Sequence, residues 1–130
     1  MIFIYWFDQD KRFISQIKPW FLKIESGKIR PITSIISVTE VLSTHKLQEL
    51  PEKLDIFKQF FINTVGLAVF DINWEIGIEA ARLRRAYPSL KTPDSLQLAT
   101  ALVHKASVFI TNDTMLTKLK ISNLEIISLS

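Results

Sequence analysis

Apolar residues recur at two different spacings along this chain. In several segments they return every three or four positions, which is the period of an amphipathic helix. Between these segments lie short runs rich in β-branched and aromatic residues, which favour strands. The pattern predicts helices over 11–25, 35–44, 51–64, 73–87, 92–106 and 114–120, and strands over 28–34, 66–72, 107–113 and 124–129.

The alternation of predicted strands and helices indicates an α/β domain with a mainly parallel sheet. A length of 130 residues suits one domain, expected to span residues 1–130. A hydrophobic content of 48% is enough for a core that needs neither disulfides nor a structural metal. In parallel sheets, functional sites form beyond the carboxyl ends of the strands, so the residues that follow each strand are the first candidates for chemistry.

Capping patterns give three carboxylates at these positions a structural explanation. Ser37-Val-Thr-Glu40 matches a capping box, in which the glutamate reaches back to the helix start. Asp94 lies in a first helical turn, behind an expected N-cap at Thr92, where a carboxylate complements the helix dipole. Asn112 or Asp113 is placed to cap the helix after the third strand. A further N-cap is expected at Asn73.

The same three carboxylates also allow a catalytic interpretation. If Glu40, Asp94 and Asp113 converge, their charges repel one another and require a cation. Oxygen-rich sites of this kind suit Mg²⁺ or Mn²⁺. A divalent ion beside a phosphodiester activates water and stabilises the leaving oxygen. The combination would be a metal-dependent nuclease.

Three motifs resemble those of the PIN-domain family, in particular the ribonuclease toxins of VapC type. They are "TSIISVTEVL" (33–42), "TPDSLQLATAL" (92–102) and "FITND" (109–113), and the likeness covers nearly the whole chain. The resemblance implies a three-layer α/β/α PIN-like domain that binds Mg²⁺ or Mn²⁺ and cuts RNA. It assigns Glu40, Asp94 and Asp113 as catalytic and metal-binding residues, with Thr111 and Asn112 as supporting polar residues.

The resemblance also implies partners: an RNA substrate, a cognate antitoxin protein and a second copy of the chain in a homodimer. A net charge of +3 and a pI of about 9.3 are compatible with a polyanionic partner. Arg82, Arg84, Arg85 and Lys91 lie close in sequence to Asp94 and are candidates for binding RNA phosphates. The alternative for these four residues is a solvated helix face.

The opening "MIFIYWFDQD" departs from the family pattern, which begins with an apolar strand that ends in Asp. In this chain "IFIYWF" aligns with the apolar run that follows that strand. The first central strand and its Asp are therefore expected to be missing or replaced, with upstream DNA encoding them in frame. One alternative is that residues 2–7 become extended and fill the gap. Another is that the run is a strand delivering Asp8 and Asp10, as in phosphatases of the haloacid dehalogenase type.

Three functional hypotheses follow. The first is an endoribonuclease toxin, and the second is an inactive PIN-like module that binds an antitoxin or RNA. The third is the phosphatase, whose motif continues with Gly-Thr where this chain has Lys11 and Arg12. No basic stretch precedes the opening run, no apolar stretch of about 20 residues occurs, and the chain has no Cys. These features argue against export and a membrane span and indicate a cytoplasmic protein.

Overall fold

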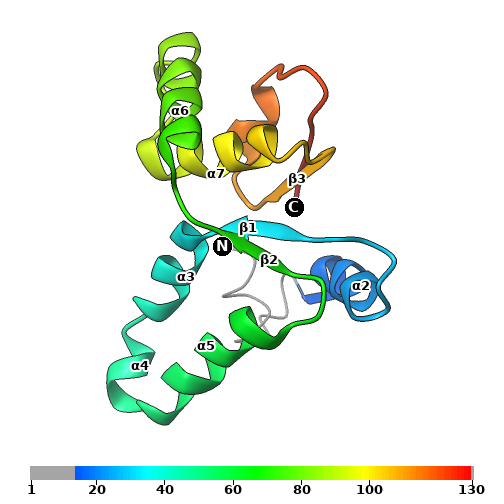
Figure 1. Ribbon diagram of the computed structural model, residues 1–130, viewed down its shortest axis with the longest axis vertical. Coiled ribbons are helices and arrows are strands. Elements are labelled where there is room, and N and C mark those ends of the chain that lie inside the picture. The colour runs from blue at the N-terminus through cyan, green and yellow to red at the C-terminus, as the bar shows by residue number, and fades with distance from the viewer. Residues whose placement is uncertain (1–13, 130) are drawn as a thin grey trace.

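The computed structural model describes residues 14–129 (Figure 1). The expectations about the opening run, Asp8 and Asp10 concern residues outside this range. The elements are α2 (Ile14–Glu25), β1 (Ile32–Ser34), α3 (Ile35–Leu42), α4 (Lys46–Glu49), α5 (Glu52–Asn63), β2 (Ala68–Phe70), α6 (Trp74–Ala86), α7 (Thr92–Val103), β3 (Val108–Thr111), η1 (Thr114–Lys118) and β4 (Glu125–Ser128). None of the helices in the described range is long and apolar enough to cross a bilayer.

The strands form two parallel pairs. β1 pairs with β2, with Ile32 opposite Ala68, and β3 pairs with β4, with Val108 opposite Glu125. This confirms the α/β class with parallel strands. Within residues 14–129 no ladder joins the two pairs.

A cavity of about 710 Å³ is lined by both β1 and β3. Its remaining walls come from α2, α3, α7, the loops before β1 and β3, and Asn112 directly after β3. Apolar side chains such as Phe21 and Phe109 line part of it, whereas Thr33 and Thr111, near the carboxyl ends of β1 and β3, are polar. Two neighbouring strand ends therefore contribute to one partly polar cavity.

Helices α6 and α7 pack against each other and form the larger apolar core. Its members are the buried residues Ile76, Ala80, Leu83, Leu90, Leu98, Ala99, Ala101, Leu116 and Leu124. A second cluster joins α2 to the end of the chain through Ile17, Phe21 and Leu129. In Figure 1, α6, α7 and β3 lie on one side of the β1–β2 pair, and α3, α4 and α5 lie on the other. One side of α7 thus packs against α6 in the larger core, and α7 also contacts β1.

The helix ends confirm some capping predictions and overturn others. Asn73 caps α6 as predicted, because its side chain accepts a hydrogen bond of 2.9 Å from the backbone N–H of Ile76. The capping box at Ser37–Glu40 is wrong. The N-cap of α3 is Ser34, whose hydroxyl accepts from the N–H of Ile36 at 3.1 Å. Ser37 already lies inside the helix and is buried.

The start of α7 also differs from the prediction. Lys91 is the N-cap and Thr92 is the first helical residue, so the expected N-cap at Thr92 is wrong by one position. Proline is tolerated throughout the first turn, because the N–H groups there have no partner within the helix. The presence of Pro93 therefore did not fix the helix start to a single residue. Asp94 still lies in the first turn, as predicted.

Candidate functional site

Glu40 and Asp94 line the same cavity. Glu40 lies on α3 and Asp94 in the first turn of α7, and both side chains are partly buried. The cavity is also lined by Thr33, Ser37 and Gln97. Two of the three predicted acids are thus brought together from positions 54 residues apart (94 − 40 = 54).

The electrostatics connect Asp94 with both of the other acids. Burial is the main cause that raises the pKa of Asp94, the negative charge of Asp113 raises it further, and the positive charge of Lys91 opposes the shift. Burial is likewise the main cause that raises the pKa of Glu40, and the charge of Asp94 adds to it. Asp94 is therefore central to the group.

Asp113 serves a structural role at the same time. It is exposed and is the N-cap of η1, where its carboxylate accepts a hydrogen bond of 2.9 Å from the N–H of Met115. The expectation of a capping residue here is confirmed. The hydroxyl of the buried Thr111 accepts from the N–H of Asp113 at 3.0 Å, and Asn112 lines the cavity. The end of β3 thus holds Asp113 close enough to Asp94 for their charges to interact.

The donor set suits a hard divalent cation but is incomplete. Two partly buried carboxylates with raised pKa values favour a bound positive charge. However, no three His, Cys, Asp or Glu side chains in the described range gather closely enough to hold a metal. The two findings agree, because charges interact over distances longer than the roughly 2 Å of a metal–oxygen bond. The described residues therefore bring together two carboxylates that a divalent cation could bind, without a third at metal-binding distance.

A polar network missed by the sequence analysis lies beside the acids. The side-chain amide of Gln97 donates to the hydroxyl of Ser37 at 2.8 Å, and its oxygen accepts from the hydroxyl of Ser34 at 2.8 Å. Ser37 and Thr33 share a further hydrogen bond of 2.6 Å. The available signal was Gln97 itself, a polar residue one turn after Asp94, between Leu96 and Leu98.

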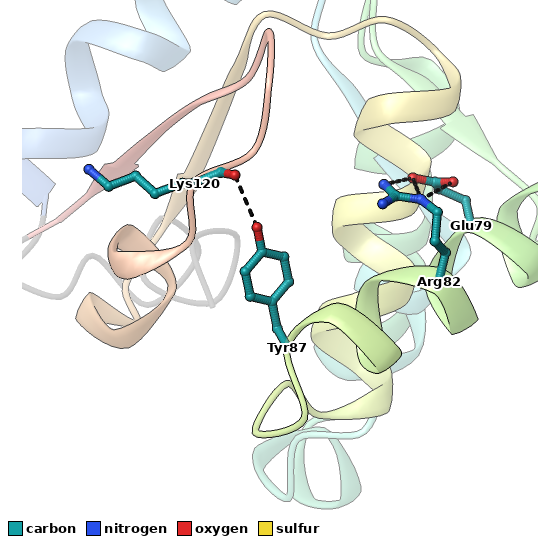
Figure 2. A network of polar contacts seen from close by, with 4 residues as sticks. All are labelled: Glu79, Arg82, Tyr87 and Lys120. Carbon is teal, nitrogen blue, oxygen red and sulfur yellow. Dashed lines mark hydrogen bonds and ion pairs between the residues drawn. The ribbon is translucent and has the colours of Figure 1, made fainter.

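The four predicted RNA-binding residues have different surroundings. Arg82 is paired with Glu79, to which its Nε donates at 3.0 and 3.1 Å (Figure 2). The Nε of Arg84 donates to the carbonyl of Leu90 at 3.1 Å. Arg85 is exposed on α6. Of the four, Lys91 is the one whose charge affects the pKa of Asp94, so it is the strongest candidate for a phosphate contact at this site.

A hydrogen bond between distant segments anchors the connection between α6 and α7. The hydroxyl of Tyr87 donates to the carbonyl of Lys120 at 3.0 Å, which Figure 2 shows between the end of α6 and the segment before β4. The connection that leads into Lys91 and Asp94 is thereby tied to the C-terminal part of the chain.

Comparison with known proteins identifies the family. The model of the PIN domain matches residues 1–121. The structure resembles a chain of a toxin–antitoxin complex from Klebsiella pneumoniae with a TM-score of 0.52 and 24% sequence identity, over 70% of this chain and 68% of that chain. No curated protein matches the sequence. With most of its length covered by the family model, the chain belongs to the PIN-domain family.

Proposed function

We propose that this chain is a metal-dependent endoribonuclease of VapC type, the toxin component of a toxin–antitoxin system. The observation that carries the proposal is the pair of partly buried carboxylates, Glu40 and Asp94, on one cavity. The charge of Asp113 acts on Asp94 from the end of β3. PIN domains are generally nucleases, and this arrangement of acids fits that chemistry.

In the proposed site, Asp94 and Glu40 hold a Mg²⁺ or Mn²⁺ ion and Asp113 adds negative charge from the rim. When bound, the ion supplies Lewis acidity that activates water and stabilises the leaving oxygen of a phosphodiester. Thr111 and Asn112 supply polar groups beside the acids. Lys91 attracts the RNA phosphate toward this edge, because its ammonium lies close enough to interact with Asp94.

The proposed partners are a cognate antitoxin and a second copy of the chain, in a cytoplasmic setting. The similarity to a chain from a toxin–antitoxin complex supports an antitoxin partner. Large apolar side chains on α5 and α6 provide surface for protein contacts, since Ile62 is 63% and Trp74 is 87% exposed.

A second candidate function is that of an inactive PIN-like module that binds an antitoxin or RNA. It is favoured by the lack of a three-acid cluster of metal-binding geometry in the described range. The two candidates differ in one outcome, which is metal-dependent cleavage of RNA.

The first prediction concerns stability without metal. Because the folded state raises the pKa of Asp94, its protonated form is favoured by folding. The resulting stability is present below the usual pKa of 3.8 and is lost as the pH rises through the higher folded value. Asp94→Asn should therefore raise the free energy of unfolding at pH 7 in EDTA, and the gain should vanish near pH 3, as measured by urea denaturation.

Asp71→Asn is the matched control, because Asp71 is exposed and directly follows β2. It should change stability little at either pH. Mn²⁺ in millimolar excess should raise the melting temperature of the wild type and of Asp71→Asn by mass action, but not that of Asp94→Asn. Equal stabilities of the wild type and Asp94→Asn at pH 7 in EDTA would contradict the conclusion that burial of the ionised Asp94 carboxylate destabilises the fold.

The second prediction tests catalysis. Wild-type protein should cleave a mixed RNA pool in Mn²⁺ and lose that activity in EDTA. Glu40→Gln, Asp94→Asn and Asp113→Asn should each reduce the initial rate by about 100-fold or more, the order expected for damage to a metal site, whereas Asp71→Asn should not. A wild-type protein that binds RNA or antitoxin but cleaves nothing in Mn²⁺ would favour the inactive module.

The third prediction concerns RNA affinity. Lys91→Ala should weaken RNA binding and reduce the slope of log affinity against log salt by about 1, as expected for one lost phosphate contact. Arg82→Ala is the control, because Arg82 is already paired with Glu79. Fluorescence anisotropy with labelled RNA in EDTA measures both quantities. An unchanged salt slope for Lys91→Ala would remove Lys91 from the RNA-binding surface.

A further inference from the structure

Gln97 connects the two helices that carry the acids of the cavity. On α7, Gln97 lies three residues after Asp94, and on α3, Ser37 lies three residues before Glu40. Residues three apart on a helix share a face. The hydrogen bond from Gln97 to Ser37 therefore joins α7 to α3 one turn away from both carboxylates. All four residues line the same cavity.

The network uses both the oxygen and the nitrogen of the amide at position 97. The hydroxyl oxygen of Ser34 already accepts from the N–H of Ile36, and its proton is donated to the Gln97 oxygen. The hydroxyl oxygen of Ser37 accepts a hydrogen bond from the side-chain nitrogen of Gln97 and shares a further hydrogen bond with the hydroxyl of Thr33. One side chain must thus accept from Ser34 and donate to Ser37. Glutamine does both, whereas glutamate lacks the donor and leucine lacks both groups.

Burial makes these hydrogen bonds strict in geometry. Ser34 is 0% and Ser37 is 3% exposed, so loss of a partner would leave a buried hydroxyl group without one of its hydrogen bonds. The network joins β1, α3 and α7, because Thr33 and Ser34 lie on β1, Ser37 on α3 and Gln97 on α7. α7 reaches β1 and α3 at this point, and the amide fixes how the helices meet.

We propose that Gln97 is a positioning residue that holds Glu40 and Asp94 at the separation needed for one divalent cation. The proposal rests on the proposed function, since it assigns Gln97 a role in the same metal site. Loss of the amide allows α3 and α7 to shift relative to each other. The two carboxylates can then no longer coordinate the same ion. Each carboxylate itself remains in place on its helix.

The test is the Mn²⁺ affinity of the full chain by isothermal titration calorimetry, at a temperature where circular dichroism shows every variant folded. Gln97→Leu should weaken Mn²⁺ binding about 10-fold or more, the range for loss of a group that orients metal ligands. Thr100→Val is the matched control. It removes a buried hydroxyl one turn later on α7, where the hydrogen bond of 2.7 Å to the carbonyl of Leu96 stays within the helix.

Thr100→Val should bind Mn²⁺ within about twofold of the wild type, even though it loses the hydrogen bond of a buried hydroxyl. If Gln97→Leu does not fold, Ser37→Ala carries the same test, because it deletes the partner hydroxyl with a smaller change in volume. It should also weaken Mn²⁺ binding. This readout separates positioning from a general loss of stability, which would affect the control as well.

The outcomes distinguish the two proposals. Wild-type affinity in Gln97→Leu, or an equal loss in Thr100→Val, overturns the role of Gln97 and leaves the metal site standing. A wild-type chain that binds no Mn²⁺ overturns the metal site and the positioning role together. Weak binding in Gln97→Leu or Ser37→Ala, with normal binding in Thr100→Val, establishes the positioning role.

Discussion

The contact of α7 with β1 and α3 is the interaction on which the candidate site depends. The β1–β2 and β3–β4 pairs are not joined by a ladder within residues 14–129, and α7 contacts both β1 and α3. α7 packs against α6 through an apolar face and presents Gln97 to Ser34 and Ser37. Ser34 is at once the N-cap of α3 and a partner of Gln97. The start of one helix and the docking of another thus share one hydroxyl.

Glu40 and Asp94, which lie at this contact, lower the stability of the fold when ionised, but their carboxylates are the groups that a metal site needs. Burial disfavours the ionised forms of Glu40 and Asp94, and the neighbouring acids add repulsion. A protein under selection for stability alone would replace them with neutral residues. Asp113 avoids much of this cost because it is exposed and caps η1. Structural and catalytic interpretations therefore coexist at Asp113, whereas the capping explanation fails at Glu40.

Local patterns predicted most elements, because periodicity, caps and turns act within a few residues. The end of α2 is an example: Gly27 follows "IES" and adopts a φ of 77°, a conformation that glycine reaches without strain. The pairing of Arg82 with Glu79 also follows from their spacing on one helix. The N-cap of α3 lies three residues before the predicted Ser37, and the N-cap of α7 lies one residue before Thr92, at Lys91, whose side chain makes no capping hydrogen bond. The short helix α4 was not predicted.

Long-range features were beyond this kind of inference. The partners of Gln97 lie 60 and 63 residues away, and no periodicity specifies which polar residue on α7 meets which serine. The stacking of His104 on Phe70, with ring centroids 3.5 Å apart, is likewise a contact between residues far apart in the sequence that no local pattern predicts. The placement of Glu40, Asp94 and Asp113 after strands or at helix starts suggested that they could converge, but each motif alone also had a structural explanation, and the resemblance to a family was needed to favour the shared site.

The central claim is that Glu40 and Asp94 jointly bind one divalent cation in the cavity between the strand pairs. Anomalous X-ray diffraction at the manganese edge, on crystals of the full chain grown with Mn²⁺, tests it most directly. The account predicts a single strong anomalous peak in contact with carboxylate oxygens of both residues. A peak bound by neither residue, or no peak in the cavity at saturating Mn²⁺, would contradict it.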